Sequence, residues 1–114
     1  MLFFSTLNAK AQKNTNDGVW VGQGYQFNNN STWSVKLKIQ DNIYTIDYPS
    51  INCKAKLLVE KIEDNKIYLS EKLTSGNCVS GGRVVLEIIG SNEILYKWSF
   101  INGEPGSYAR LIRF

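Results

Sequence analysis

Apolar and polar residues alternate along most of the chain from Gly18 onward. The clearest run is 33–39, where Trp, Val, Leu and Ile alternate with Ser and Lys. A period of two places the apolar residues of a strand on one face and the polar residues on the other. No window shows the i, i+3, i+4, i+7 spacing of an amphipathic helix. The pattern therefore predicts an all-β domain whose strands have one buried face.

Turn-forming residues separate these runs. Asp41-Asn42 is a two-residue hairpin signal, and Pro49 ends the strand that follows it. Further strands are expected at about 18–27, 33–39, 53–62, 66–73, 83–89, 94–100 and 107–114. Short connections favour antiparallel neighbours, so about eight strands should form a meander. Such a sheet closes into a small barrel or folds into a sandwich, and we favour the barrel because closure removes exposed edges.

The N-terminus resembles the tail of a secretory signal peptide. Residues 1–7 are apolar, and Ala9-Lys10-Ala11 has the small-x-small pattern that signal peptidase cuts. Because no Lys or Arg precedes the apolar run, we interpret residues 1–11 as a truncated signal; a hydrophobic N-terminal strand is the alternative. Residues 12–17 are then a flexible lead-in, and residues 18–114 form a single β domain that is secreted, periplasmic or in the cell envelope.

Cys53 and Cys78 are the only cysteines, and an even number in an exported chain indicates a disulfide. A hairpin that turns near residues 63–66 brings Cys53 opposite a position near Gly76, about two residues from Cys78. Modest slack in the loop then lets the sulfurs meet. A metal site built on these two cysteines lacks its other ligands, so the sequence predicts one disulfide bond.

Composition excludes several classes of function. The 114-residue chain has a formal net charge of +3, and its lysines are spread along the sequence, so no footprint for nucleic acid appears. No later stretch approaches the ~20 apolar residues of a membrane helix, so the domain is not expected to span a membrane. Histidine is absent, which excludes Ser-His-Asp and Cys-His catalysis and the HExxH zinc motif. We expect a monomeric, non-enzymatic domain without cofactor or metal.

Aromatic residues and two glutamates are the candidates for a binding site. Aromatic side chains can line a pocket that stacks on a sugar or encloses an apolar ligand. The candidates for such a lining are Trp20, Tyr25, Trp33, Tyr44, Tyr48, Tyr96 and Trp98. Glu71 and Glu87 each share a strand face with apolar neighbours, and an inward carboxylate needs a partner. We expect Glu71 to form a buried ion pair with Arg83 or Arg110.

Two sets of residues resemble known β domains. Gly18-Val19-Trp20, together with Arg110 or Arg113, resembles the lipocalin and avidin-like barrels, in which an N-terminal Gly-x-Trp packs against a late arginine and closes one end. A longer stretch resembles a small exported bacterial β domain without an established function, sometimes attached to serine/threonine kinases. Its matching residues are Trp20-x-Gly22, Tyr48-Pro49-Ser50, Cys53, Glu71, Gly76-x-Cys78-Val79-x-Gly81-Gly82, Leu86 and Tyr96-x-Trp98. This resemblance implies the sheet and the disulfide, departs from the family pattern at Ala55, and supplies no catalytic residues.

These observations favour an exported, non-enzymatic binding module that contacts a small ligand or an envelope component through the open end of the barrel. The alternative is an inhibitor of a secreted hydrolase, similar to the small periplasmic lysozyme inhibitors, with residues 102–106 as the inserted loop. A basic face is a further candidate contact for anionic cell-wall polymer or lipid headgroups, although solubility alone also explains it. Its members are Lys36, Lys38, Lys54 and Lys56.

Overall fold

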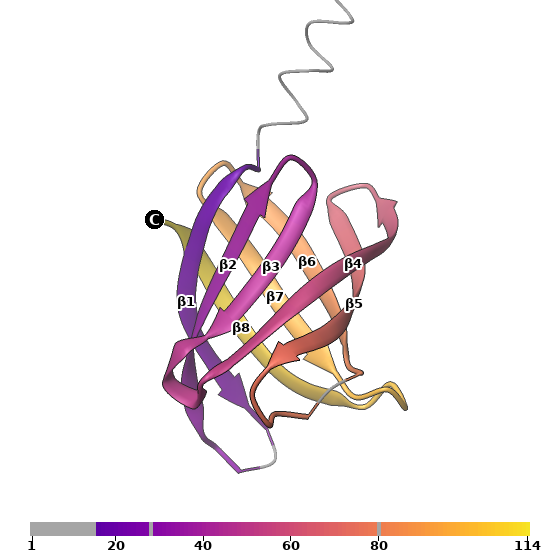
Figure 1. Cartoon of the computed structure of the whole chain (residues 1–114). Coiled ribbons are helices and arrows are strands. Elements are labelled where there is room, and N and C mark those ends of the chain that lie inside the picture. Colours follow the sequence, from indigo (N-terminus) through magenta and orange to yellow (C-terminus); the bar gives the residue numbers. More distant parts are fainter. Residues whose placement is uncertain (1–15, 28, 80) are drawn as a thin grey trace, which may run out of the picture.

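The protein is a closed antiparallel β-barrel (Figure 1). The computed structural model describes residues 16–27, 29–79 and 81–114, so the expectations for residues 1–15 lie outside the described part. The strands are β1 Gly18–Gln26, β2 Thr32–Gln40, β3 Ile43–Tyr48, β4 Cys53–Glu63, β5 Lys66–Ser75, β6 Arg83–Gly90, β7 Glu93–Ser99 and β8 Pro105–Arg113. Each strand pairs with the next in sequence, and β8 pairs with β1. The predicted eight-strand meander and the choice of a barrel over a sandwich are confirmed.

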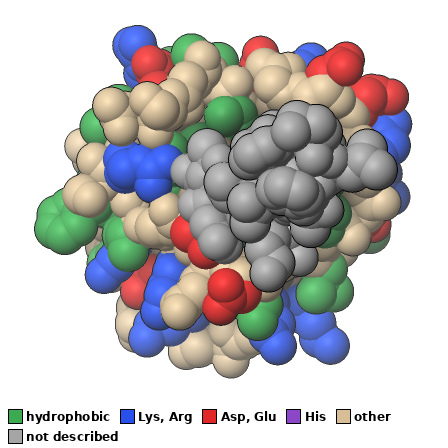
Figure 2. All heavy atoms as spheres, turned by 90° about the horizontal axis from the view of Figure 1, so that it is seen from above, with side chains coloured by type: hydrophobic (Ala, Val, Ile, Leu, Met, Phe, Trp, Pro, Cys, Tyr) green, Lys and Arg blue, Asp and Glu red, His purple; other side chains and the backbone are tan. Residues whose placement is uncertain are grey.

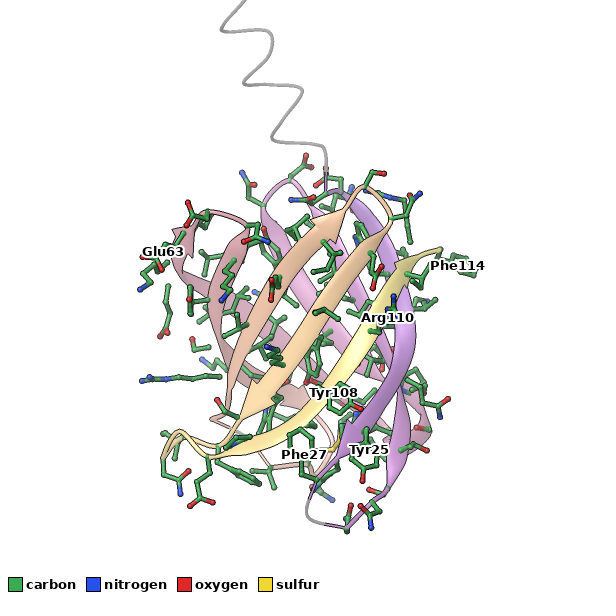
Figure 3. All side chains as sticks on the ribbon, turned by 180° about the vertical axis from the view of Figure 1, so that it is seen from behind. Tyr25, Phe27, Glu63, Tyr108, Arg110 and Phe114 are labelled. Atoms are coloured by element: carbon green, nitrogen blue, oxygen red, sulfur yellow. A yellow bond between two sulfur atoms is a disulfide. The ribbon has the colours of Figure 1, made fainter. Side chains whose placement is uncertain are left out.

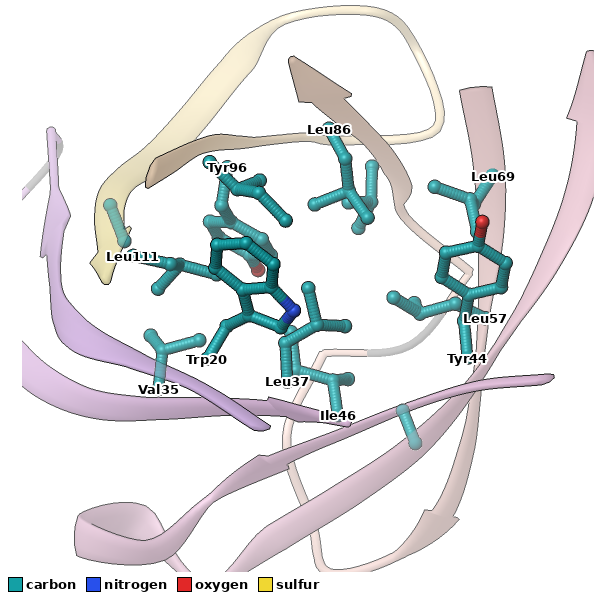
Figure 4. Close-up of a cluster of buried hydrophobic side chains, with 14 of the residues drawn as sticks. Trp20, Val35, Leu37, Tyr44, Ile46, Leu57, Leu69, Leu86, Tyr96 and Leu111 are labelled. Atoms are coloured by element: carbon teal, nitrogen blue, oxygen red, sulfur yellow. The ribbon is translucent and has the colours of Figure 1, made fainter. Parts of the chain in front are cut away.

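The alternation in the sequence becomes the inside and the outside of the barrel. Along β2 every second residue from Trp33 to Ile39 is buried, whereas Lys36 and Lys38 between them are exposed. Inward side chains of all eight strands meet in one core (Figure 4). Burying one large aliphatic side chain contributes about 1.5–3 kcal/mol, so this core is the main source of stability. Its large, fully buried members include Trp20, Leu37, Leu69, Leu86, Tyr96 and Leu111.

The two ends of the barrel differ in their connections. At the short-turn end, two-residue turns at 41–42, 64–65 and 91–92 join consecutive strands. Asp41 and Asn42 have φ angles of 53° and 65°, as a type I′ hairpin turn requires. At the long-loop end the connections are residues 27–31, 49–52, 76–82 and 100–104. The second of these contains a single 3-10 turn, η1 Pro49–Ile51.

Trp20 and Arg113 close the short-turn end, onto which Figure 2 looks. Trp20 is fully buried, and the Arg113 guanidinium lies over its ring, 4.2 Å from the centroid. The indole Nε1 donates to the Asn16 carbonyl (3.1 Å), and Arg113 Nη1 donates to the Asp17 carbonyl (2.7 Å). The contact between Gly-x-Trp and a late arginine is thus present, made by Arg113. Asn16 and Asp17, the last residues of the predicted flexible lead-in, are held against the barrel.

The predicted disulfide between Cys53 and Cys78 lies at the long-loop end, where it ties the start of β4 to the 76–82 loop. The two Cα atoms are 6.3 Å apart. Gly76 beside it has a φ of 99°, and a Cβ there would lie 2.7 Å from Cys53 Sγ, so this position requires glycine. A disulfide is compatible with an oxidising compartment outside the cytoplasm.

Candidate functional site

A cavity of about 280 Å³ lies at the long-loop end of the barrel. Small-molecule pockets in proteins have volumes from ~300 Å³ upward, so this cavity suits a compact ligand. Ile51 and Val79 on its rim have 48% and 63% of their surface exposed, which shows that the mouth reaches solvent. Its wall includes Trp33, Tyr48, Glu71, Tyr96, Trp98 and Phe100.

Aromatic rings from three strands of the sheet contribute to this wall. Trp33 is the first inward-facing residue of β2, and Tyr48 is the last residue of β3. Strand β7 contributes Tyr96 and Trp98. The Tyr48 and Tyr96 rings meet edge to face with centroids 6.5 Å apart, and the Trp98 and Phe100 rings do so at 4.7 Å. These contacts fix the ring planes that a ligand would meet.

Two glycines make room for the Trp98 indole. A Cβ at Gly82 would lie 2.3 Å from the ring, and a Cβ at Gly106 would lie 2.4 Å from it. Neither distance is possible for a real side chain, so the ring packs directly on the backbone at both positions. The 76–82 loop and the start of β8 therefore set where Trp98 lies in the cavity wall.

Glu71 projects inward from β5 and is the buried carboxylate of the site. Tyr48 Oη donates to Glu71 Oε2 at 2.5 Å, and Trp98 Nε1 donates to Glu71 Oε1 at 2.9 Å. The Tyr48 and Tyr96 hydroxyls lie 2.7 Å apart, and since the Tyr48 proton points to Glu71, Tyr96 donates to Tyr48. Ser107 in turn bonds to the Tyr96 hydroxyl. A directed chain of donors thus ends on one carboxylate.

Burial shifts the titration of these groups. Desolvation raises the pKa of Glu71 above its ordinary value, and the hydrogen bonds from Tyr48 and Trp98 oppose that rise. Burial also raises the pKa of Tyr48 and of Tyr96, and the nearby Glu71 charge adds to both shifts. Both tyrosines therefore keep their protons and act as hydroxyl donors near neutral pH.

The structure corrects the expected ion pair of Glu71. Its partners are a tyrosine and an indole, while Arg110 lies on the outer face of β8 and pairs with Glu93. Arg83 is exposed at a position of β6 opposite Ser70, the residue before Glu71. Neighbouring residues of a strand face opposite sides, so Arg83 lies outside the wall that Glu71 faces.

Glu87 was also expected to point inward, and it does not. It lies on the outward face of β6, because Val84 and Leu86 are the buried members of that strand. Apolar residues occupy both faces of this segment, so alternation alone assigned it to the wrong face.

The aromatic candidates separate into three places. Trp33, Tyr48, Tyr96 and Trp98 line the cavity. Trp20 is core at the short-turn end, and Tyr44 borders a separate hollow of about 190 Å³ near that end.

Tyr25 lies outside the barrel. Its ring contacts Phe27 and Tyr108, whose ring centroids are 5.9 and 5.8 Å from its own (Figure 3). Tyr25 is therefore not part of the cavity wall, contrary to the prediction.

Sequence reasoning did not single out Phe100, Ser107 or Gln26, which also line the cavity. Ser107 lies opposite Trp98 in the pairing of β7 with β8, so a small inward residue faces a large one. The pairing of Ser107 with Trp98 could have identified Ser107 as a cavity residue, but finding it requires the register of β7 and β8. Phe100 belongs to a loop, where alternation carries no information.

The remaining candidates lie elsewhere on the surface. The lysines of the basic face come together on the outside of β2 and β4, where Asp47 of β3 lies between Lys36 and Lys54. The predicted inhibitory loop, residues 102–106, lies at the cavity end, where Asn102 Oδ1 accepts a hydrogen bond from the Glu104 amide.

Within the described residues, no group of three or more His, Cys, Asp or Glu side chains could hold a metal ion. No helix in that part of the chain is long and apolar enough to cross a membrane. Comparison of the chain with known protein families, curated proteins and solved structures found no match.

Proposed function

We propose that this protein is an exported, non-enzymatic binding module that takes a compact ligand into the cavity at its long-loop end. The observation that carries this proposal is the cavity itself: a solvent-reaching hollow of about 280 Å³ with aromatic walls and one buried carboxylate. Mostly apolar walls with a few convergent polar groups are typical of small-molecule sites.

Two further features support this function. The Glu71 carboxylate accepts hydrogen bonds on both oxygens from Tyr48 and Trp98, which suits the fixed recognition of a ligand. Trp20 and Arg113 form the closing contact that resembles lipocalin and avidin-like barrels, folds whose small members hold one ligand inside. The disulfide and the apolar N-terminus support a secreted or envelope location.

Nuclear magnetic resonance with a fragment library tests the proposal, because the three tryptophans are built-in probes. We expect binding compounds to shift the indole N–H signals of Trp33 and Trp98 and to leave that of Trp20 unchanged. Leu73→Trp adds bulk to the cavity wall and should abolish these shifts. Ile112→Trp, which adds an indole on the exposed face of β8, is the matched control and should leave them intact.

The absence of any compound that shifts the two cavity tryptophans would overturn the proposal. So would shifts that persist in a folded Leu73→Trp variant, because the compounds would then bind elsewhere.

The basic face favours contact with an anionic envelope polymer as a second function. The strand register places Asp47 between Lys36 and Lys54. It places Thr45 between Lys38 and Lys56, and it pairs Lys56 with Lys72. Lys36, Lys38, Lys54 and Lys56 line a hollow of about 430 Å³, and Asp47 is the one acidic residue in its described lining. Facing positive charges attract a polyanion more strongly than dispersed ones.

Binding to a soluble polyphosphate, measured at low and high salt, tests this second function. We expect replacement of Lys36, Lys38, Lys54 and Lys56 by serine to abolish salt-sensitive binding. A control that removes the same number of lysines elsewhere should retain it. Equal loss in both variants would indicate a response to net charge alone.

A further inference from the structure

We infer that the ligand of the cavity carries a protonated amine, or another compact organic cation, on an apolar body, with the positive group bound against Glu71. This inference rests on the proposed binding function and specifies the class of ligand.

The first argument is an uncompensated charge. Glu71 retains only 5% of its accessible surface, and a buried carboxylate normally has a cationic partner. Among the described residues, Glu71 is the one charged side chain in the cavity wall, and none there is Lys or Arg. The described site therefore supplies a negative charge and leaves the positive charge to the ligand.

The second argument is the geometry of the carboxylate. Each oxygen receives one hydrogen bond from the described residues, one from Tyr48 and one from Trp98. An ionised carboxylate has about four acceptor positions in total, so one more position remains on each oxygen. Both present partners are themselves fixed by packing, which orients the carboxylate before a ligand arrives.

The third argument is the aromatic wall. The edge-to-face pairs of Tyr48 with Tyr96 and of Trp98 with Phe100 both lie in the wall of this hollow. An ammonium or guanidinium group is attracted to such ring faces, and the attraction grows when water is excluded. An anionic ligand would instead meet both the carboxylate and the negative ring faces.

The test compares three compounds of the same shape: cyclohexylamine, cyclohexanol and cyclohexanecarboxylate. Affinity is measured at neutral pH by calorimetry, with the Trp98 indole N–H signal as evidence of location. We expect the amine to bind about tenfold tighter than the alcohol, as for a charge-assisted hydrogen bond. The carboxylate should not bind.

Glu71→Gln keeps the shape of the side chain and removes its charge. In this variant the amine should bind only as well as the alcohol, while the affinity for the alcohol should change little. Glu93→Gln, which removes the exposed charge paired with Arg110, is the matched control and should preserve the preference for the amine.

A second readout needs no variant. Lowering the pH toward about 4 should weaken the amine and spare the alcohol, since Glu71 takes up a proton while the amine stays charged. Tyr48 and Tyr96, the other titratable groups that face Glu71, remain protonated throughout. This measurement decides the question if Glu71→Gln fails to fold.

The possible results distinguish a failure of the amine inference from a failure of the proposed binding function. If the alcohol or the carboxylate binds at Trp98 as tightly as the amine, or if the library yields only neutral and anionic ligands, the amine inference is wrong and the binding function stands. If no compound in the panel or the library reaches the cavity, both are wrong.

Discussion

The two ends of the barrel use tryptophan in opposite ways. At the short-turn end, Trp20 is fully buried, its N–H bonds to the backbone, and Arg113 covers its ring. At the long-loop end, the Trp98 N–H bonds to a carboxylate and its ring borders a cavity. The strands are the same at both ends, so the connections make the difference: two-residue turns draw the strands together, whereas longer loops surround an opening.

Of the variants considered, Trp20→Ala should lose the most stability. Its affinity for a cavity ligand should stay the same. Truncating a buried tryptophan costs about 3–5 kcal/mol, because the remaining cavity does not collapse fully. Urea unfolding measures this loss, and calorimetry under native conditions measures affinity for a cavity ligand. Trp98→Ala should show the reverse pattern, with abolished binding and a smaller loss of stability. If both variants weaken binding equally, the two ends are coupled and the comparison fails.

Removing the disulfide should act mainly at the long-loop end. Replacing Cys53 and Cys78 together by alanine lowers the free energy of unfolding by about 3 kcal/mol in the chain-entropy account. Amide hydrogen exchange should accelerate in residues 76–82, which the bond anchors, and stay slow around the 41–42 turn. Acceleration of similar size at both ends would show that the bond stabilises the barrel as a whole.

Gly106→Ala should displace the Trp98 ring. The added methyl group would overlap the indole, and overpacking of this kind costs about 1–3 kcal/mol. The indole N–H signal of Trp98 should move, and ligand affinity should fall. Gly90→Ala is the matched control, because a Cβ at Gly90 meets no atom within 4 Å. An unchanged Trp98 signal in Gly106→Ala would contradict the packing of the indole on the Gly106 backbone.

Glu71→Gln should change how stability depends on pH. The glutamine offers one acceptor oxygen in place of two, so Tyr48 Oη and Trp98 Nε1 cannot each keep a separate acceptor oxygen at any pH. Burial raises the pKa of Glu71 in the folded state, so folding favours the protonated form. The stability that this group contributes is present at low pH and is lost as the pH rises through the folded-state pKa. The stability of the variant relative to the Glu71 protein should therefore fall as the pH drops from neutral toward about 4. Thermal unfolding of both proteins across this range measures the difference. A variant that gains stability relative to the Glu71 protein on acidification would contradict the raised pKa of Glu71.

Arg110→Ala should have the smallest effect. Arg110 pairs with Glu93 on the outer surface, so its removal should leave the titration of the Glu71 carboxyl unchanged. Carbon-13 resonances of the glutamate side chains report this directly. A shift in the titration of Glu71 would instead indicate that Arg110 interacts with Glu71, as the sequence suggested.

Alternation and turn chemistry were sufficient to predict most of the fold. Residues 33–39 have one apolar and one polar face, and Asp41-Asn42 adopts the positive φ angles that its hairpin signal implies. The order of the strands followed because short connections favour adjacent antiparallel strands.

The candidate site was harder to predict, because its contacts depend on register across the barrel. Tyr48 and Trp98 are 23 and 27 residues from Glu71, and nothing local to Glu71 specifies either one. The outward position of Tyr25 was more accessible: it is five residues from Trp20 on the same strand, and an odd separation places two side chains on opposite faces. If Trp20 is taken as inward-facing, this alternation places Tyr25 on the outer face and removes it from the candidates.

The pairing of β1 with β8 brings the start of the barrel and its end to the same side, with the Phe114 amide bonded to the Val19 carbonyl. That side is the short-turn end, where the C-terminus lies opposite the long loops (Figure 1). Trp20 seals this end, and the cavity lies at the other. A tag, a fluorophore or a surface linker joined after Phe114 would therefore leave the cavity facing the bulk solution. The protein can be tethered to a sensor chip in a uniform orientation, with its opening presented to the analyte.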